Sequence, residues 1–416
     1  MIKKKLLLIE TEMRGPGGHY LDNLIESFFF FQKDFNVSAL LNKRFNSEGT
    51  YIPKELNINK IINRNNFEKK EHKFLHYLFE LFIIFKCFSF SIILIPYFII
   101  KKNFLNYLIA LISNKFTLPR YFTEIFFFLK KSNFTENDHI FFQTTRNKHM
   151  SLANFLIRLN IDIPKIHLRV LYTPVHKRFG GFYSYLNKIK FYLMNRKICL
   201  YVLTKKNYDI LVNYLNNPNG VYLSNIPWVF YERINKNDFK TVGYMGDARI
   251  SRGFNYLPKL INELTNISKD FRFIIQYSKV NKEIKSISDE IQAIAKHNSN
   301  VTVYLKYMDY KEFRDTLQKI DIMPILHNAD EINLGNPSTI YSSITHEIPM
   351  TLPSNSKYMK NALIHKSYEE ADTIEETIKK INIIKNNYDA YLLAAKKNSK
   401  ILLEIFNNDP LKENIS

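Results

Sequence analysis

Short apolar runs alternate with polar stretches of helical spacing along the chain, and this alternation begins at the first residues. Each run is followed by a helix-like stretch or a loop, as in a parallel sheet with crossover helices. Up to about residue 230 the predicted strands are Leu6–Ile9, Val37–Leu41, His139–Gln143, His167–Tyr172, Leu200–Thr204 and Val221–Ser224. The pattern therefore predicts the α/β class.

The alternation restarts after a polar run, Glu232 to Lys240, which reads as a linker. The second set of predicted strands is Val242–Met245, Phe271–Gln276, Val301–Leu305 and Asp321–Ile325, and the segment His346–Met350 leads into another strand. A chain of 416 residues also exceeds one ordinary domain. We therefore predict two Rossmann-like domains, residues 1–230 and 241–385. We expect a C-terminal helical segment, 386–416, to pack back on the first domain.

An aromatic helical region, 67–135, interrupts the first domain. Its densest part is 74–100, where the uncharged stretch Cys87–Ile100 would form a helix of about 21 Å. That is shorter than the roughly 30 Å hydrocarbon core of a bilayer, and Pro96 interrupts it. Two interpretations stay open: a buried core element, or a patch lying in one leaflet with flanking lysines on the headgroups.

The formal net charge of +20 predicts attraction to phosphate, and we favour an anionic membrane surface as the partner. Compositional drift toward lysine is the alternative. Neither zinc-finger spacing nor a compact basic arm supports nucleic acid, so we expect no nucleic-acid partner. Cys87 and Cys199 are the only cysteines, which argues against a disulfide framework and favours a reducing compartment.

A glycine-rich loop, Arg14-Gly-Pro-Gly-Gly-His19, lies between the first predicted strand and its helix. Glycines such as Gly17 and Gly18 let the backbone approach a ligand, and a helix N-terminus favours negative charge. The loop is not the dinucleotide fingerprint. A tight turn between strand and helix is the alternative reading.

The segment from Gly243 to Phe254 gives the strongest signal. A strand ends in glycine, Arg249 and Arg252 follow three residues apart, and Gly253 opens the next helix. Two guanidinium groups and a helix N-terminus suit a diphosphate. The alternative is a solvated loop with exposed arginines.

A second candidate phosphate site follows the strand Asp321–Ile325. Ser338 and Thr339 come directly after Asn336 and Pro337, where a helix is expected to start. Their hydroxyl and amide groups suit a phosphate, although serine and threonine also cap helices routinely.

Together these segments resemble the GT-B glycosyltransferases, particularly the retaining, nucleotide-sugar-dependent branch with many bacterial polysaccharide and lipopolysaccharide enzymes. Arg252 stands where that family usually has a lysine, and the stretch through Tyr307 and Met308 resembles the part that packs the nucleotide base. One departure is clear. The family often carries two glutamates eight residues apart, and Leu334 and Ser342 stand there in this chain.

The resemblance implies two domains facing across a cleft, with the acceptor at the first and the donor at the second. It implies a metal-independent transferase without cofactor that moves a sugar from a nucleotide diphospho-sugar to a glycan or lipid-linked acceptor. The resemblance also implies that the protein acts at the cytoplasmic face of the membrane, in cell-surface polysaccharide synthesis. The donor-binding candidates are Gly17, Gly18, Arg249, Arg252, Gly253, Tyr307, Met308, Asn336, Ser338 and Thr339.

Three further residues are catalytic candidates: His19, His149 and Glu331. Either histidine is suited to orienting the acceptor hydroxyl, and Glu331 lies near the donor helix in sequence. No general base is assigned. Two other functions remain open, a non-catalytic binding or scaffold protein with this fold, and a GT-B sugar-nucleotide epimerase, which would need further carboxylates near the sugar.

Overall fold

The computed structural model divides the chain into two compact units, Met1–Pro227 with Asp409–Ser416, and Trp228–Asn408. The residues that the structure describes are 3–11, 13, 19–43, 45–46, 48, 50–62, 73–100, 104–113, 118–159, 162–171, 181–216, 219–225, 228–233, 239–327, 338–354, 356 and 363–415.

The first unit is built on a seven-stranded parallel sheet of order β3-β2-β1-β4-β5-β6-β7. Its strands are β1 (Lys5–Glu10), β2 (Asn36–Asn42), β3 (Asn57–Ile62), β4 (His139–Phe142), β5 (Lys165–Val170), β6 (Ile198–Val202) and β7 (Val221–Leu223). The central strands are buried on both faces, which explains their unbroken apolar sequences. The winding reverses between β1 and β4, as in doubly wound folds.

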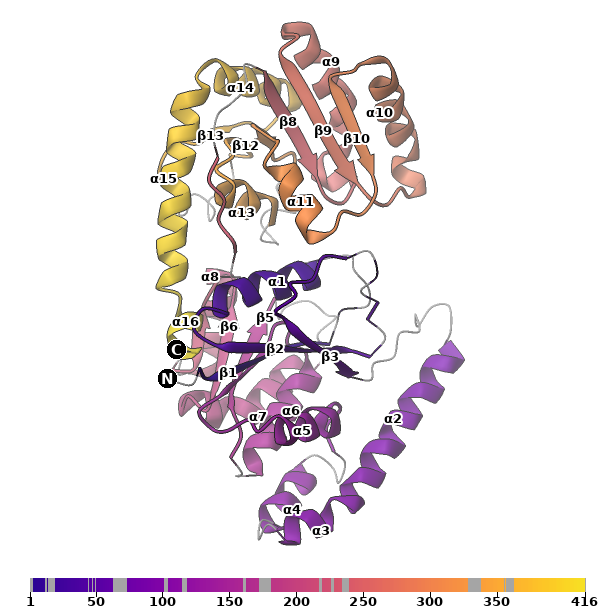
Figure 1. Ribbon diagram of the computed structural model, residues 1–416, viewed down its shortest axis with the longest axis vertical. Helices are drawn as coiled ribbons and strands as arrows, with labels where there is room; N and C mark the ends of the chain where they lie inside the picture. The colour runs from indigo at the N-terminus through magenta and orange to yellow at the C-terminus, as the bar shows by residue number, and fades with distance from the viewer. Residues whose placement is uncertain are drawn as a thin grey trace. The chain divides into compact units, whose positions relative to one another are not determined.

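Helices cover both faces of this sheet (Figure 1). They are α1 (His19–Phe31), α5 (Phe122–Lys131), α6 (Asn147–Arg158), α7 (Phe182–Met194), α8 (Lys205–Leu215) and α16 (Pro410–Ile415). Aromatic rings of α5 and α6 form much of one core layer. Phe122 lies 5.1 Å from Phe126 and 5.0 Å from Phe155, ring centre to ring centre. These rings pack with Ile140 and Ile166 of the sheet.

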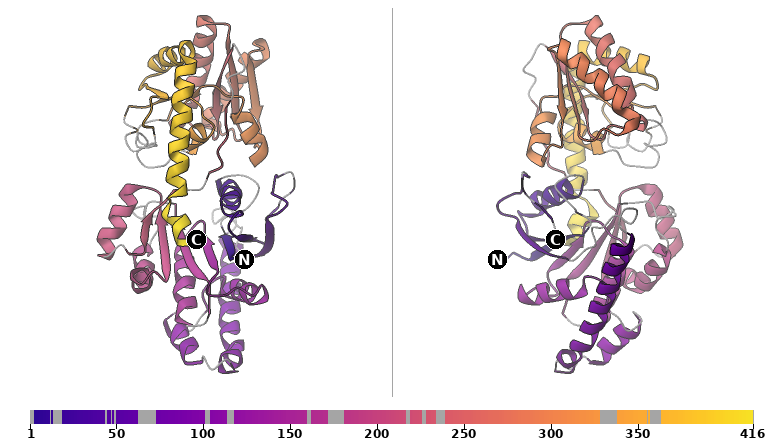
Figure 2. Two further views of the ribbon diagram at one scale, coloured as in Figure 1. Left: turned by 60° about the vertical axis from the view of Figure 1, so that its left-hand side comes forward. Right: turned by 90° about the vertical axis from the view of Figure 1, so that its right-hand side faces the viewer.

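The aromatic region forms three consecutive helices beside this layer, α2 (Lys73–Ile93), α3 (Ile95–Ile100) and α4 (Phe104–Ser113), which Figure 2 shows from two sides. The segment 74–100 is buried in part and exposed in part. Phe98 is fully buried and stacks on Tyr107 at 4.2 Å, whereas Phe85 and Ile100 are 70% and 77% exposed. Among the described residues, no helix is both long and apolar enough to span a bilayer.

The second unit has two three-stranded parallel sheets, β10-β9-β8 and β11-β12-β13. The strands are β8 (Lys240–Met245), β9 (Phe271–Tyr277), β10 (Val301–Leu305), β11 (Met323–Pro324), β12 (Met350–Leu352) and β13 (Tyr368–Glu370). A parallel bridge between Val242 and Ile322 joins β8 to the second sheet, and the Gly243 N–H donates to the Ile322 carbonyl at 3.0 Å. The winding therefore reverses between β8 and β11, in the same order as the first unit.

The helices of the second unit are α9 (Leu257–Ile267), α10 (Lys285–His297), α11 (Tyr310–Leu317), α13 (Ser338–Thr345), α14 (Ile374–Asn386) and α15 (Tyr388–Asn407). The predicted α/β class with two Rossmann-like domains is thus confirmed. Two strands were not predicted. Asn57–Ile62 is an edge strand whose sequence mixes polar and apolar residues, and Tyr368–Glu370 is three residues long and mostly polar.

The boundary between the units lies earlier than the expected 230–241, because residues from Trp228 onward are fixed to the second unit. Arg233 makes several hydrogen bonds of this attachment. Its guanidinium contacts the Asp321 carboxylate at 3.1 Å and donates to the Leu317 carbonyl at 2.9 Å. Its backbone N–H donates to Glu347 at 2.8 Å. The ring of Tyr231 stacks on His346 at 4.4 Å.

The C-terminal segment 386–416, expected to pack as a whole on the first domain, is shared between the two units. The long helix α15 belongs to the second unit, where the Tyr388 hydroxyl donates to Asp321 at 3.2 Å. Only the chain from Asp409 onward is part of the first unit. There the Asp409 carboxylate accepts hydrogen bonds from the Ser224 hydroxyl at 2.6 Å and the Asn225 N–H at 2.8 Å.

Two buried histidines lie on one face of the first sheet. His139 Nδ1 is 3.0 Å from His167 Nε2, and His167 Nδ1 is 2.9 Å from the Tyr201 hydroxyl. Burial lowers the pKa of His139 to about 4, and the nearby Lys4 and Lys165 act in the same direction. Burial also holds the pKa of His167 well below its ordinary value. Both rings are therefore neutral in the folded protein.

The unfolded chain binds protons on these histidines near pH 6.5, which the folded chain does not, so stability is lost as the pH falls from about 6.5 toward 4. We expect the free energy of unfolding, measured with urea at about pH 7 and about pH 5, to fall less in the variant His139→Gln than in the wild type. His297, exposed on α10, provides the control His297→Gln. An equal fall in wild type and His139→Gln would contradict this account.

Candidate functional site

The carboxyl ends of β8 and β11 mark the point where the winding of the second unit reverses, the place where doubly wound sheets bind ligands. After β8 the chain forms a tight loop. Gly246 has φ 125°, a 3₁₀ turn spans Ile250–Arg252, and Gly253 has φ 70°. A further 3₁₀ turn, Phe254–Tyr256, leads into α9. The predicted order of strand, glycine loop and helix is therefore present.

Gly253 brings this loop against the chain that follows β11. A Cβ atom at position 253 would lie 2.3 Å from the Leu326 Cβ and 2.5 Å from the Leu326 carbonyl oxygen. Only glycine combines this approach with the left-handed backbone. Residues 246–253 are thereby held at the reversal point, which the sequence pattern alone did not reveal.

The two arginines of the loop differ in their surroundings. Arg249 forms an ion pair with Asp247 at 2.8 Å, and both side chains are half-exposed. The side chain of Arg252 has no hydrogen bond or ion pair to any described residue, and its Nε is buried, while its backbone N–H donates to the Arg249 carbonyl at 3.0 Å. Arg252 Nη1 lies 3.9 Å from where a Cβ of Gly246 would be, so its guanidinium lies over the end of β8. Of the two loop arginines, Arg252 is thus the one whose side chain has no described ion-pair partner.

Gln276, near the end of β9, connects the loops at this edge. Its carbonyl accepts the Gly246 N–H at 3.1 Å, and its amide donates to the Lys306 carbonyl at 2.8 Å. Gln276 was not among the residues predicted from the sequence. A glutamine within the apolar strand Phe271–Tyr277 was the available signal, because a buried amide needs partners.

Tyr307 and Met308 follow β10 at the same edge, in different environments. Tyr307 is 38% exposed, whereas Met308 is buried and its sulfur accepts the Thr316 hydroxyl at 3.6 Å. Tyr307 is thus partly exposed, and Met308 packs against α11.

Ser338 and Thr339 are the first residues of α13, and both are partly exposed. Because α13 leads back into β12, its N-terminus lies toward the carboxyl edge of the sheet, and its positive dipole end faces that side. Ser342, where the family's second glutamate is expected, is buried. Asn336 and Glu331 lie outside the described residues. Within the described part of the chain, no group of three or more His, Cys, Asp or Glu residues is placed to hold a metal ion.

In the first unit, Gly17 and Gly18 lie outside the described residues, and His19 is the first residue of α1. His149, in the first turn of α6, is buried and stacks on Phe142 at 5.1 Å. Its Nδ1 accepts the Arg146 N–H at 3.0 Å, and its Nε2 is 3.0 Å from the Thr11 hydroxyl. Both ring nitrogens are engaged in fixing α6 to β1, which does not fit the expected role of orienting an acceptor hydroxyl.

The carboxyl edge of the first sheet holds a buried charge that the sequence analysis did not select. Arg169 of β5 is fully buried, its Nε donates to the Gln143 carbonyl at 3.0 Å, and its guanidinium lies 5.1 Å from the Phe141 ring centre. Burial lowers its pKa to about 10, opposed by the charges of Glu10 and Asp409. The sequence signal was an arginine inside an apolar strand.

No family model matches the chain, and no curated protein matches its sequence. Solved structures do match its fold. HepE from Anabaena, in complex with UDP and glucose, is 11% identical with a TM-score of 0.56 over 99% of this chain and 97% of that one. Sucrose-phosphate synthase from Thermosynechococcus elongatus is 8% identical, with a TM-score of 0.55 over 97% and 95% of the two chains.

A third match is a protein from Listeria monocytogenes named as a UDP-N-acetylglucosamine 2-epimerase, 9% identical with a TM-score of 0.50 over 95% of this chain and 91% of that one. At such identities the likeness concerns the fold alone. It shows that this chain has the two-domain GT-B fold, as predicted.

We expect Gly253→Ala to destabilise the second unit by about 2–5 kcal/mol, because strain of a left-handed alanine adds to overpacking against Leu326. Denaturation of the variant and hydrogen exchange of residues 246–256 would measure it. Gly181→Ala is the matched control. Gly181 also has positive φ, 82°, but a Cβ there meets its nearest atom at 3.7 Å, so only strain of about 1 kcal/mol applies. Equal losses in both variants would contradict the close-approach argument.

Proposed function

We propose that the protein is a glycosyltransferase that moves a sugar from a nucleotide diphospho-sugar to a glycan or lipid-linked acceptor. The observation that carries this proposal is the uncommitted guanidinium of Arg252 at the reversal point of a GT-B donor-type domain. UDP in the structure of HepE supports a nucleoside diphosphate as the leaving group.

The proposed sugar transfer requires stabilisation of the negative charge that develops on the diphosphate as the glycosidic bond breaks. Arg252 supplies planar paired N–H donors, which suit phosphate oxygens. The N-terminus of α13, with the hydroxyls of Ser338 and Thr339, supplies dipole and hydrogen bonds from a second element. These groups take the place of a metal in the proposed reaction. Arg249 joins them when it exchanges Asp247 for phosphate.

Other residues keep their predicted roles in this proposal. The exposed ring of Tyr307 is suited to stacking on the nucleotide base. Gln276 holds the loops that carry Gly246 and Lys306, so it positions the pocket without touching the donor. Gly17, Gly18, His19, Asn336 and Glu331 are further proposed contacts. A buried Ser342 does not reach a ribose, so that contact falls to other groups.

We further propose retaining transfer in bacterial cell-surface polysaccharide or lipopolysaccharide synthesis, at the cytoplasmic face of the membrane. The net charge of +20 supports this location, because anionic lipid headgroups attract lysine-rich proteins. An acceptor linked to lipid would place both substrates at the same surface.

We expect Arg252→Ala to weaken UDP binding by about 10- to 100-fold in titration calorimetry, as loss of a charge-assisted hydrogen bond costs roughly 1.5–3 kcal/mol. Arg249→Ala should lose less, because its charge is already shared with Asp247. Arg272→Ala, exposed near the start of β9, serves as the control and should bind normally. Unchanged affinity in Arg252→Ala would rule out the proposed phosphate contact.

A sugar-nucleotide epimerase is the second candidate, favoured by the fold likeness to the Listeria protein. Incubation of the purified chain with UDP-N-acetylglucosamine distinguishes the two. A new epimeric UDP-sugar without acceptor would favour epimerisation, and acceptor-dependent release of UDP would favour transfer. Binding of UDP without either product would indicate the non-catalytic alternative.

A further inference from the structure

The helices α2–α4 expose an apolar surface that no described element covers. We call it the outer face, and it consists of Phe82, Phe85, Phe88, Ile92, Ile100 and Leu105. Phe85 is 70% exposed, Ile100 77% and Leu105 68%. In α2 these residues recur at intervals of three and four, which places them on one side of the helix. Extended apolar patches of this kind on soluble proteins mark interaction sites.

The charge of the same region indicates what covers the outer face. From Lys73 to Lys131 the sequence has eight basic residues against two acidic ones. One of the acids, Glu124, is already paired with Lys86 at 2.5 Å. Burial opposes ionisation of Glu124, but the hydrogen bond and charge of Lys86 outweigh it and lower its pKa. The region is therefore complementary to an anionic, apolar partner. A second copy of this chain would present the same positive charge and repel.

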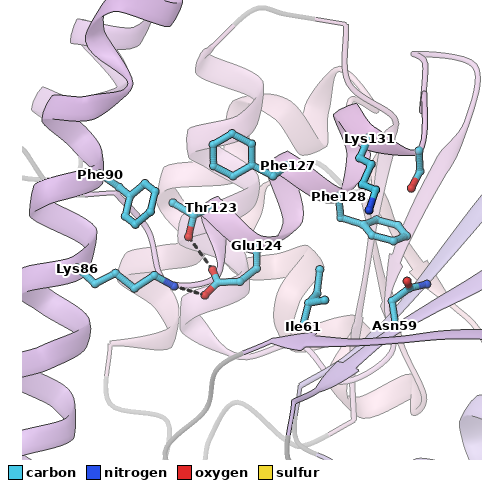
Figure 3. A pocket seen from close by; sticks show the side chains of 10 residues that line it. Asn59, Ile61, Lys86, Phe90, Thr123, Glu124, Phe127, Phe128 and Lys131 are labelled. Carbon is cyan, nitrogen blue, oxygen red and sulfur yellow. Dashed lines mark hydrogen bonds and ion pairs between the residues drawn. The ribbon is translucent and has the colours of Figure 1, made fainter.

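A pocket of about 430 Å³ opens beside these helices, between α2, α5 and β3 (Figure 3). Its apolar walls are Ile61, Phe90, Phe127 and Phe128, and Phe127 is also 47% exposed at the surface. Lys131 lies across the pocket from the pair Lys86–Glu124 (Figure 3). The Lys131 ammonium has no ion pair or hydrogen bond to a described residue. A volume of this size is typical of small-molecule sites.

We propose that α2–α4 dock on an anionic phospholipid bilayer, and that the pocket holds part of one lipid, with its chain against Phe90 and Phe128 and its phosphate at Lys131. The proposal rests on the proposed function only for the membrane as the place of work. It adds the surface that makes the contact and the chemical class of the pocket's ligand.

Flotation with vesicles tests the surface. The wild type should float with phosphatidylglycerol–phosphatidylcholine vesicles, weakly with phosphatidylcholine alone, and less at high salt. Phe85→Ser/Phe88→Ser should float at least tenfold less, since two aromatic rings no longer enter the bilayer. The control is Phe191→Ser, which removes an equally exposed ring from α7. Because the variant side chains are exposed, both proteins should retain the wild-type melting temperature.

Two variants test the pocket. Lys131→Gln should weaken vesicle binding about fivefold, the effect of one lysine at an anionic surface, whereas the exposed control Lys206→Gln on α8 should not. Asn59→Trp fills the pocket from the edge strand β3, where a large aromatic residue is tolerated. A phosphatidylglycerol with a photoreactive chain should label peptides containing Phe127 and Phe128 in the wild type and not in Asn59→Trp.

Equal flotation on neutral and anionic vesicles would overturn the charge argument, and equal flotation of the double variant would overturn the outer face. Labelling that Asn59→Trp leaves unchanged would overturn the pocket. Sedimentation as a lipid-free dimer that Phe85→Ser/Phe88→Ser dissociates would assign the face to a second copy instead. None of these readouts uses sugar transfer or UDP binding, so failure of the proposed function is measured separately, in the second unit.

Discussion

The contact between Gly253 and Leu326 is the constraint on which the candidate donor site depends. It holds the loop after β8 on the chain after β11, at the point where the winding of the second unit reverses. Without that contact, Arg252 would be one more surface arginine among many. With it, the guanidinium is held over the carboxyl end of β8 with its Nε buried and no described partner. The backbone geometry of Gly253 thus fixes the loop that carries Arg252.

Both units have the same doubly wound strand order, but they differ in the polar groups at the carboxyl ends of their strands. In the second unit the amide of Gln276 joins two loops, and the Arg252 guanidinium lies beside one of them, near Gly246. In the first unit the buried guanidinium of Arg169 donates from Nε to the Gln143 carbonyl and lies over the ring of Phe141, while its Nη1 and Nη2 have no hydrogen-bond partner among the described residues. Both ring nitrogens of His149 in the first unit have partners. One accepts the Arg146 N–H at the start of α6, and the other lies beside the Thr11 hydroxyl. Buried guanidinium nitrogens without a described partner therefore occur at strand ends of both units, on Arg169 in the first and Arg252 in the second.

The sequence predicted strands well where burial on both faces makes apolar residues continuous, as in Leu6–Ile9 and Val301–Leu305. It failed where exposure interrupts that pattern, at the edge strand Asn57–Ile62 and the short Tyr368–Glu370. The segment Trp228–Arg233 looked like the end of a domain because its anchors are not local. Arg233 is held by Asp321, 88 residues later in the chain. His149 looked available for the same reason, since its partner Thr11 precedes it by 138 residues. The amino-acid composition of a short segment does not reveal contacts with residues so far away in the sequence.

The helices α2–α4 show why composition alone left two interpretations of 74–100 open. Phenylalanine and isoleucine serve equally well against a protein core and against lipid, so an apolar stretch does not state which one it faces. The structure separates them by side: Phe98 and Tyr107 face inward and stack, while Phe85 and Leu105 have no protein against them. A helix buried in a core would lose stability if its outer side chains became polar, whereas one that meets a bilayer would lose only its partner. In these helices the described inward side chains include stacked aromatic rings, and the described outward side chains are apolar and exposed.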